Sequence, residues 1–119
     1  MSRRYKLYAA ETGTSYRYFF LTSRRVVRPE GQGRGGDYVF VVTADQSLPF
    51  ILRIFVSERA REAWRKARGR ELDANEEYAA AKMRLFRGFD EIERLRDAHL
   101  SLLVDETNVE ELLEPLDLG

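Results

Sequence analysis

The N-terminal half of the chain has the pattern of β-strands. Apolar and polar residues alternate over residues 5–9, and residues 16–21 are rich in the aromatic side chains that favour strands. A turn-forming segment with a glycine, residues 11–15, separates the two and predicts a hairpin. The strand pattern continues over residues 24–28 and stops at Pro29, which has no backbone N–H to donate.

Two further strands are predicted at residues 38–43 and 50–56, joined by a loop over residues 44–49. One face of the second strand carries Phe50, Leu52, Ile54 and Val56, and the other carries Ile51, Arg53 and Phe55. Both faces are largely apolar, which is typical of a strand that is central in its sheet. We therefore expect its second face to be covered in part, by a helix or by a second copy of the protein.

The C-terminal half has the pattern of helices. Residues 58–68 contain no helix breaker, Ser57 is a good N-cap, and Gly69 is a suitable C-terminal stop. Small side chains and Trp64 share one stripe, so this helix can approach the sheet closely with the tryptophan as its anchor. The stripe consists of Ala60, Ala63, Trp64 and Ala67. Another face of the same helix collects Arg61, Arg65 and Arg68.

Residues 73–97 predict the longest helix. Asp73 and Glu76 have the spacing of a capping box. The apolar stripe consists of Tyr78, Ala81, Leu85, Phe89 and Ile92, with Phe86 and Leu95 beside it. At about 1.5 Å per residue such a helix is about 36 Å long. It would cross the whole domain or project from it, unless Gly88 lets it bend.

Two short elements complete the pattern. Residues 99–104 partly alternate and predict a last strand, with continuation of the helix as the alternative. Residues 107–110 resemble a capping box for a short helix over residues 109–114, which Pro115 ends.

Strands followed by helices predict an α+β fold, because a parallel α/β sheet would alternate the two. We expect an antiparallel sheet of roughly four to six strands, built from N-terminal hairpins, with two to three C-terminal helices packed mainly on one face. The length of 119 residues predicts a single domain over residues 1–119. It is strand-rich over residues 4–56 and helix-rich over residues 57–119.

The glycine-rich segment at residues 31–36 matches the pattern G-x-G-x-x-G. The dinucleotide-binding form of this pattern needs a helix after it, because the helix N-terminus holds the pyrophosphate. A strand follows here, so the context fails. We instead predict a flexible loop over residues 29–37 between two strands.

The composition removes many kinds of active site. The chain has no cysteine, which excludes disulfides, thiolate metal sites and cysteine nucleophiles. It has one histidine, His99, with no motif that places a partner beside it. Adjacent carboxylates on a helix, such as Asp90 and Glu91, point about 100° apart and do not converge. We expect no cofactor, no metal and no catalytic residue, so the sequence leans away from an enzyme.

The formal net charge is zero but its distribution is uneven. Residues 1–70 carry 15 basic and 6 acidic residues, whereas residues 71–119 carry 5 basic and 14 acidic residues. The two halves therefore have net charges of +9 and −9. Either the basic half binds an anionic partner, or the two halves neutralise each other within one fold.

The sequence favours two functions over small-molecule binding and enzymatic activity, and it does not identify the partner. The first is a non-catalytic protein–protein interaction module, such as a small regulator or assembly subunit, that binds a protein partner, itself as a homodimer or larger homo-oligomer, or both. Its candidate interface residues are Ile51, Phe55, Phe86 and Leu95. The alternative is a nucleic-acid-binding module that uses a basic, aromatic-bearing sheet and the arginine-rich helix over residues 58–70. Its candidate contacts are Arg24, Arg25, Arg28, Arg34, Arg61, Arg65 and Arg68.

Neither a signal peptide nor a membrane span is expected. Glu11 and Thr12 interrupt the residues after the charged N-terminus, and the longest apolar runs are far shorter than a span of about 18 residues. We therefore expect a soluble, cytoplasmic protein with no membrane partner.

Overall fold

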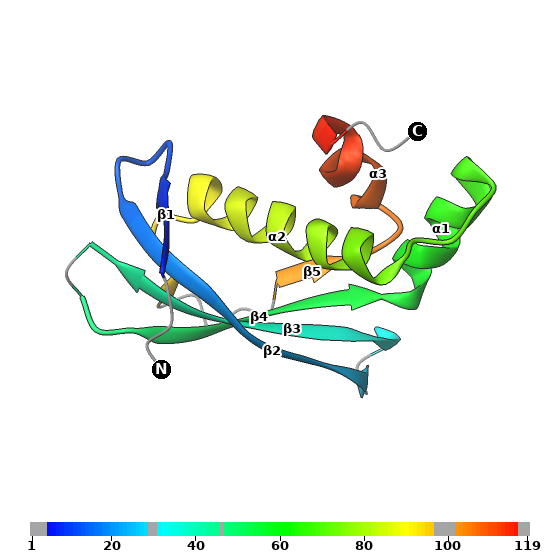
Figure 1. Cartoon of the computed structure of the whole chain (residues 1–119), viewed down its shortest axis with the longest axis horizontal. Coiled ribbons are helices and arrows are strands. Elements are labelled where there is room, and N and C mark those ends of the chain that lie inside the picture. Colours follow the sequence, from blue (N-terminus) through cyan, green and yellow to red (C-terminus); the bar gives the residue numbers. More distant parts are fainter. Residues whose placement is uncertain (1–4, 29–30, 46, 97–101, 117–119) are drawn as a thin grey trace.

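The computed structural model describes residues 5–28, 31–45, 47–96 and 102–116 (Figure 1). The strands are β1 (Lys6–Ala9), β2 (Ser15–Arg28), β3 (Gly33–Ala44), β4 (Phe50–Ser57) and β5 (Leu102–Val104). The helices are α1 (Glu58–Arg68), α2 (Ala74–Glu91) and α3 (Val109–Leu113), followed by a short 3-10 turn, η2 (Glu114–Leu116). The five strands form one sheet in the order β1-β2-β3-β4-β5, and the helices pack on one face of it.

This architecture confirms the predicted α+β fold, with one correction. The first four strands pair antiparallel, as expected, but β5 pairs parallel to β4. The chain leaves the end of β4, passes through α1 and α2, and returns to run in the same direction beside it. A connection of this length is what parallel neighbours require.

The β1–β2 hairpin forms as predicted, and β2 continues far beyond it. The described pairs join β1 to the start of β2 only, from Ser15 to Tyr18. A register shift between Phe20 and Thr22 marks a β-bulge against β3. After the bulge, β2 follows β3 to its end at Arg28, so the second half of a long strand projects past β1.

The prediction of a flexible loop over residues 29–37 is wrong for its second half, because β3 already begins at Gly33. Two of these glycines are required by close packing. A Cβ on Gly35 would collide with the carbonyl oxygen of Val56 on the neighbouring strand, and a Cβ on Gly36 would collide with the carboxylate of Glu77. The glycines thus allow other groups to approach the backbone of a strand.

Helix α1 has the predicted bounds and caps. The Ser57 hydroxyl accepts a hydrogen bond from the backbone N–H of Ala60 at 3.3 Å, and Gly69 ends the helix in the left-handed conformation with φ of 73°. Trp64 is buried against the core, as expected of an anchor. This end of the fold is therefore fixed by local signals that agree with the tertiary packing.

Helix α2 begins at the predicted capping box of Asp73 and Glu76 but ends earlier than expected. Its last helical residue is Glu91, and Ile92 is already extended. The helix has 18 residues and is therefore about 27 Å long at about 1.5 Å per residue. The chain turns so that Leu95 is buried in the core, whereas a continued helix would have projected.

The last elements agree with their predicted positions only in part. The expected strand over residues 99–104 is present as β5, and its first three residues lie outside the described residues. Helix α3 begins at Val109, but the predicted capping box is wrong. The Asn108 side chain instead accepts from the backbone N–H of Asp105 and donates to the carbonyl of Leu103, both at 2.9 Å. It is used to fix the turn that joins β5 to α3.

The core lies between the sheet and the helices. Aromatic rings from β2 meet α2 there, and Tyr16 stacks on Phe89 with ring centroids 4.2 Å apart. The largest buried apolar side chains are Trp64, Tyr16, Phe40, Phe55, Phe89 and Ile54. All of these except Phe55 belong to the cluster between the two layers. Phe55 is therefore buried on the other face of the sheet, outside this core.

Candidate functional site

The face of the sheet away from the helices is covered by no described element, and we call it the open face (Figure 1). Strand alternation and the cross-strand register identify its side chains. Phe19 lies opposite Val41, and Val41 lies opposite Ile51. Tyr5 packs edge-on against Phe19 with ring centroids 4.9 Å apart. These four residues form an apolar row across four neighbouring segments of the chain.

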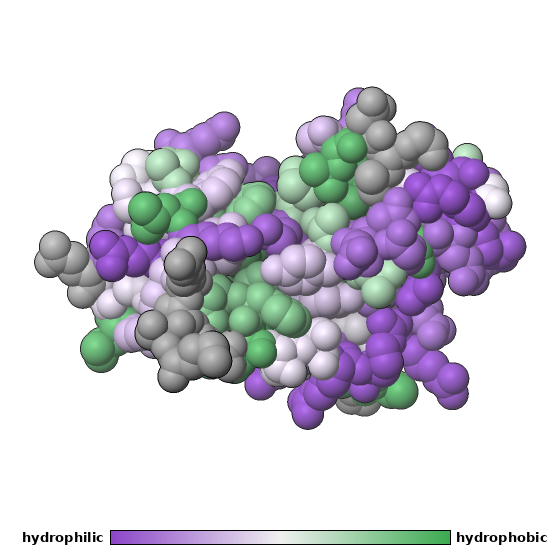
Figure 2. All heavy atoms as spheres, viewed as in Figure 1, coloured by the Kyte–Doolittle hydropathy of each residue, from purple (hydrophilic) through white to green (hydrophobic). Residues whose placement is uncertain are grey.

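The apolar row reaches solvent at both of its ends. Tyr5 is 41% exposed and Ile51 is 51% exposed, and Leu7, on the same side of β1, is 75% exposed. Figure 2 shows hydrophobic patches between hydrophilic side chains where β1 and β2 lie toward the viewer, and mainly hydrophilic surface around α1 and the far ends of β2 and β3. A sheet that faces water on one side usually alternates to polar residues there, so this row is unusual.

Beside the row, the open face has a depression lined by arginines, which we call the arginine pocket. The buried carboxylate of Asp37 accepts a hydrogen bond from Arg28 at 2.8 Å and forms an ion pair with Arg53 at 3.4 Å. Arg24 lies opposite Asp37 in the register. The cavity has a volume of about 320 Å³ and is lined by Arg24, Val26, Val27, Arg28, Asp37 and Arg53. Three arginines against one aspartate leave a net charge of +2.

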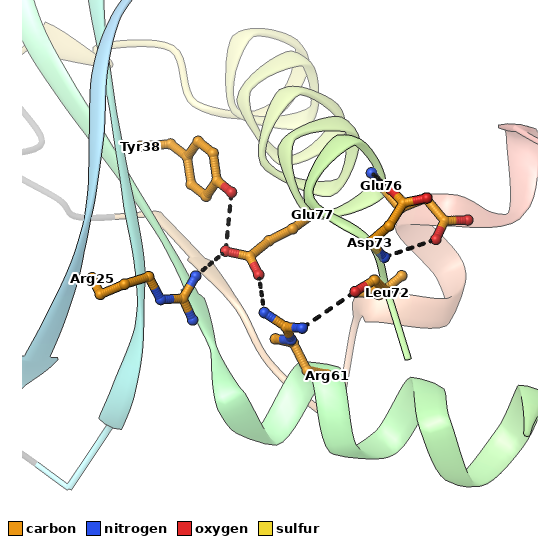
Figure 3. A network of polar contacts seen from close by, with 7 residues as sticks. All are labelled: Arg25, Tyr38, Arg61, Leu72, Asp73, Glu76 and Glu77. Atoms are coloured by element: carbon orange, nitrogen blue, oxygen red, sulfur yellow. Dashed lines mark hydrogen bonds and ion pairs between the residues drawn. The ribbon is translucent and has the colours of Figure 1, made fainter. Parts of the chain in front are cut away.

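A second arginine–carboxylate group, the Glu77 cluster, lies on the helix side of the sheet (Figure 3). The Glu77 side chain is 2% exposed. It accepts hydrogen bonds from Arg25 at 2.5 Å, from Arg61 at 2.8 Å and from the Tyr38 hydroxyl at 3.0 Å. Arg61 also donates to the carbonyl of Leu72 at 3.2 Å. The cluster therefore ties β2, β3, α1 and α2 together.

The electrostatics of the Glu77 cluster fit a structural role. Burial raises the pKa of Tyr38, and the nearby charge of Glu77 raises it further, so the phenol stays protonated and donates to the carboxylate. The adjoining cavity of about 530 Å³ is lined by Arg25, Glu58, Arg61, Glu62, Arg65 and Glu71. Its three arginines face three glutamates, with Glu77 beneath, so there is no positive excess to attract an anion.

The seven arginines predicted to contact nucleic acid do not form one surface. Arg24 and Arg28 line the arginine pocket, whereas Arg25, Arg61 and Arg65 lie on the helix side. Arg25 and Arg61 are engaged by Glu77, and Arg65 pairs with Glu62 on the same helix. Arg68 stacks on Trp64 at 4.8 Å, and Arg34 is exposed near the start of β3.

The four predicted interface residues are also separated. Ile51 lies exposed in the apolar row, and Phe55 is on the same face but 1% exposed, with the Arg28 guanidinium 5.0 Å from its ring centroid. Phe86 stacks on Tyr8 at 4.7 Å in the helix layer, and Leu95 is buried in the core. The helices do not cover the second face of β4, which lies fourth in the sheet.

Several residues of the open face were not among the predicted site residues, namely Leu7, Arg17, Asp37, Val41 and Arg53. For Arg17 the sequence carries a signal, because strand alternation points its side chain away from the face that holds Tyr16 and Tyr18. The sequence does not give the register between strands, and this register brings Arg28 and Arg53 to the same aspartate, Asp37.

The charge asymmetry between the halves is partly resolved inside the fold. Arg25 and Arg61 neutralise Glu77, Arg68 lies 4.0 Å from Glu110, and Arg70 pairs with Glu76 at 2.8 Å. Basic residues of the first half thus neutralise acidic residues of the second. Two arginines of the open face, Arg28 and Arg53, pair instead with Asp37, a carboxylate of the same half.

A groove on the helix side has the opposite charge to the open face. It has a volume of about 320 Å³ between β1, α2 and α3, and its charged lining residues are Glu11, Arg87, Asp90, Glu91 and Glu111. The Tyr8 hydroxyl donates to Asp90 at 2.6 Å, and burial together with this bond raises the pKa of Tyr8 to about 12. Arg87 pairs with Glu111 at 3.3 Å. Four carboxylates against one arginine leave a net charge of −3, and we call this the acidic groove.

Comparison with known proteins identifies no relative: no family model, no curated protein and no solved structure matches the chain. Among the described residues, no group of histidine and acidic side chains has the geometry to hold a metal ion. None of the described helices is both long and apolar enough to cross a membrane. His99, the single histidine of the sequence, lies outside the described residues.

Proposed function

We propose that this protein is a non-catalytic interaction module that self-associates, with the open face of its sheet as the binding surface. The apolar row carries this proposal. Its ends, Tyr5 and Ile51, are exposed where an outward-facing sheet would normally present polar side chains. A contiguous apolar patch with a polar border is typical of a protein interface.

Light scattering after size exclusion tests this proposal. We expect the average mass to rise with protein concentration and to exceed that of the monomer at about 100 μM, a concentration that reveals weak association. Replacing two exposed residues of the open face, as Leu7→Ser together with Ile51→Ser, should return the protein to a monomer.

The control is Leu48→Ser, because Leu48 is 76% exposed but lies in the connection between β3 and β4. This variant should associate like the unchanged protein. A strict monomer at about 100 μM, at both low and moderate salt, would contradict self-association.

A second candidate function is the binding of single-stranded nucleic acid, and one observation favours it. The open face combines aromatic side chains, Tyr5 and Phe19, with arginines at the surface. Single-stranded nucleic acids bind such faces through base stacking and phosphate contacts. On this hypothesis the contacts are those of the sheet, and the arginines of α1 contribute little.

Fluorescence anisotropy with short single-stranded DNA and RNA tests the alternative. Roughly three phosphate contacts would give a slope of log affinity against log salt of about −2, at about 0.7 for each contact. Arg24→Ala together with Arg53→Ala should weaken binding, whereas Arg65→Ala on α1 should not. Absence of binding at low salt would end this hypothesis.

A further inference from the structure

The open face is strongly basic. Of the described strand residues that point away from the helices, the charged ones are Arg17, Arg24, Arg28, Arg53 and Asp37. Four arginines and one aspartate leave this face with a net charge of +3. The charges surround the apolar row, so any surface that covers the row must lie against them.

This charge disfavours the simplest dimer. In a two-fold symmetric dimer the same patch occurs on both sides of the interface. Two open faces would then bring a charge of +3 against another +3, and like charges placed across an interface cost several kcal/mol. The positive charge of the open face therefore favours an acidic partner surface over a second open face.

The chain itself has such a surface on its other side. The acidic groove has a net charge of −3, equal and opposite to the open face, and lies on the helix side of the sheet between β1, α2 and α3. Glu91 and Glu111 at its rim are exposed. Leu112 and Pro115 also line it, so the groove offers apolar contacts among its carboxylates.

We infer that the open face of one copy receives the acidic groove of a second copy, so that the protein assembles head to tail. This inference rests on the proposed self-association and names the surfaces that meet. The two surfaces of one molecule face opposite ways, so each copy can bind one neighbour on each side. Such a heterologous interface gives a closed ring if its rotation closes and an extended chain if it does not.

Complementary charge reversals test the arrangement by light scattering at several protein concentrations. Variant A carries Arg17→Glu and Arg24→Glu on the open face, and variant B carries Glu91→Lys and Glu111→Lys at the groove. Each variant alone should associate at least roughly tenfold more weakly than the unchanged protein. An equal mixture of A and B should associate again, because the groove of A and the open face of B are both intact.

Matched controls change the same number of charges elsewhere. Arg59→Glu with Lys66→Glu on α1 controls for variant A, and Glu93→Lys with Glu106→Lys in turns controls for variant B; all four side chains are exposed. Both controls should associate like the unchanged protein. Circular dichroism of every variant verifies the fold, and an unfolded variant is replaced by its single-site form.

The outcomes separate this inference from the proposed function. If variant B associates like the unchanged protein, the groove takes no part, and head-to-tail assembly is wrong while self-association stands. If A and B are both monomeric and their mixture stays monomeric, the inference is also overturned. If the unchanged protein is itself a strict monomer at every concentration, the proposed self-association fails first.

Discussion

The two faces of the sheet each hold a buried carboxylate between two arginines, but the two groups connect different things. On the helix side, Glu77 joins two strands to two helices through Arg25, Arg61 and Tyr38. On the open face, Asp37 joins β3 to β2 and β4, strands that backbone hydrogen bonds already hold together. The same arginine–carboxylate contacts therefore join sheet to helices on one face and neighbouring strands on the other.

This comparison shows that topology, more than local chemistry, decides what such a group does. Glu77 fixes the packing of the helices against the sheet, and the arginines around it are balanced by glutamates. Asp37 instead fixes the positions of Arg28 and Arg53 on a face that no described element covers. A buried carboxylate that holds arginines at a surface is suited to preparing that surface for a partner.

The largest expected difference is between removing the two carboxylates. Glu77→Ala leaves Tyr38 and two arginines without their common acceptor and separates the layers, so it should lower the free energy of unfolding by about 3–5 kcal/mol. Asp37→Ala should cost about 1–2 kcal/mol, because no buried hydroxyl loses its acceptor and the strands that Asp37 joins stay paired through their backbones. Urea unfolding at one protein concentration measures both, and equal losses would contradict the comparison.

The contribution of packing on the two faces can be compared by replacing one isoleucine of β4 on each face. Ile54 is completely buried beneath the helices, so Ile54→Ala should lower the free energy of unfolding by about 2–4 kcal/mol. Ile51→Ala, on the open face, should cost less than about 1 kcal/mol at concentrations where the protein is monomeric. A large loss for Ile51→Ala in the monomer would mean that the apolar row stabilises the fold of the single chain.

Two adjacent glycines of β3 allow the same comparison, because on each face another group lies close to the strand backbone. In Gly35→Ala the new methyl group meets the carbonyl oxygen of Val56, which cannot move without breaking the β3–β4 pairing. In Gly36→Ala it meets the ends of the Glu77 and Arg25 side chains, which can shift. We expect losses of about 3 and about 1 kcal/mol respectively, measured by thermal or urea unfolding. The reverse order would show that the Glu77 cluster is the more rigid neighbour.

The smallest effect is expected for a pair outside both faces. The Arg70 guanidinium lowers the pKa of Glu76 from 4.5 to about 2, and the backbone N–H of Asp73 adds to the effect. A lowered pKa means that this pair stabilises the fold above about pH 4.5 and that the contribution is lost as the pH falls toward 2. Because the Arg70 side chain is exposed and solvent screens the pair, Glu76→Gln should cost less than about 1 kcal/mol at pH 7.

Acid titration followed by circular dichroism checks this last expectation. The stability difference between Glu76→Gln and the unchanged protein should shrink as the pH falls through the window from 4.5 to about 2. A difference that stayed constant with pH would mean that the helix cap, and not the charge of Glu76, carries the effect.

The elements of the fold could largely be predicted from the sequence. The bounds and caps of α1, the capping box of α2 and the β1–β2 hairpin depend on neighbours within a few residues, and they formed as expected. The α+β arrangement followed from the order of the strand and helix patterns. In the glycines of β3 a distant contact overrides the local pattern, whereas at α3 a competing local turn uses the Asn108 side chain in place of the predicted cap.

The candidate site depended on the tertiary structure to a much greater degree. The sequence established a basic half, an acidic half, an arginine-bearing helix and a strand that is apolar on both faces. It could not determine which arginines meet a carboxylate, because that depends on the register of β2 against β3 and on the bulge after Phe20. Local patterns act over a few residues, whereas Arg25 meets Glu77 across 52 positions of the chain. Only the folded sheet, with helices on one face, separates neutralised arginines from those that remain at the surface.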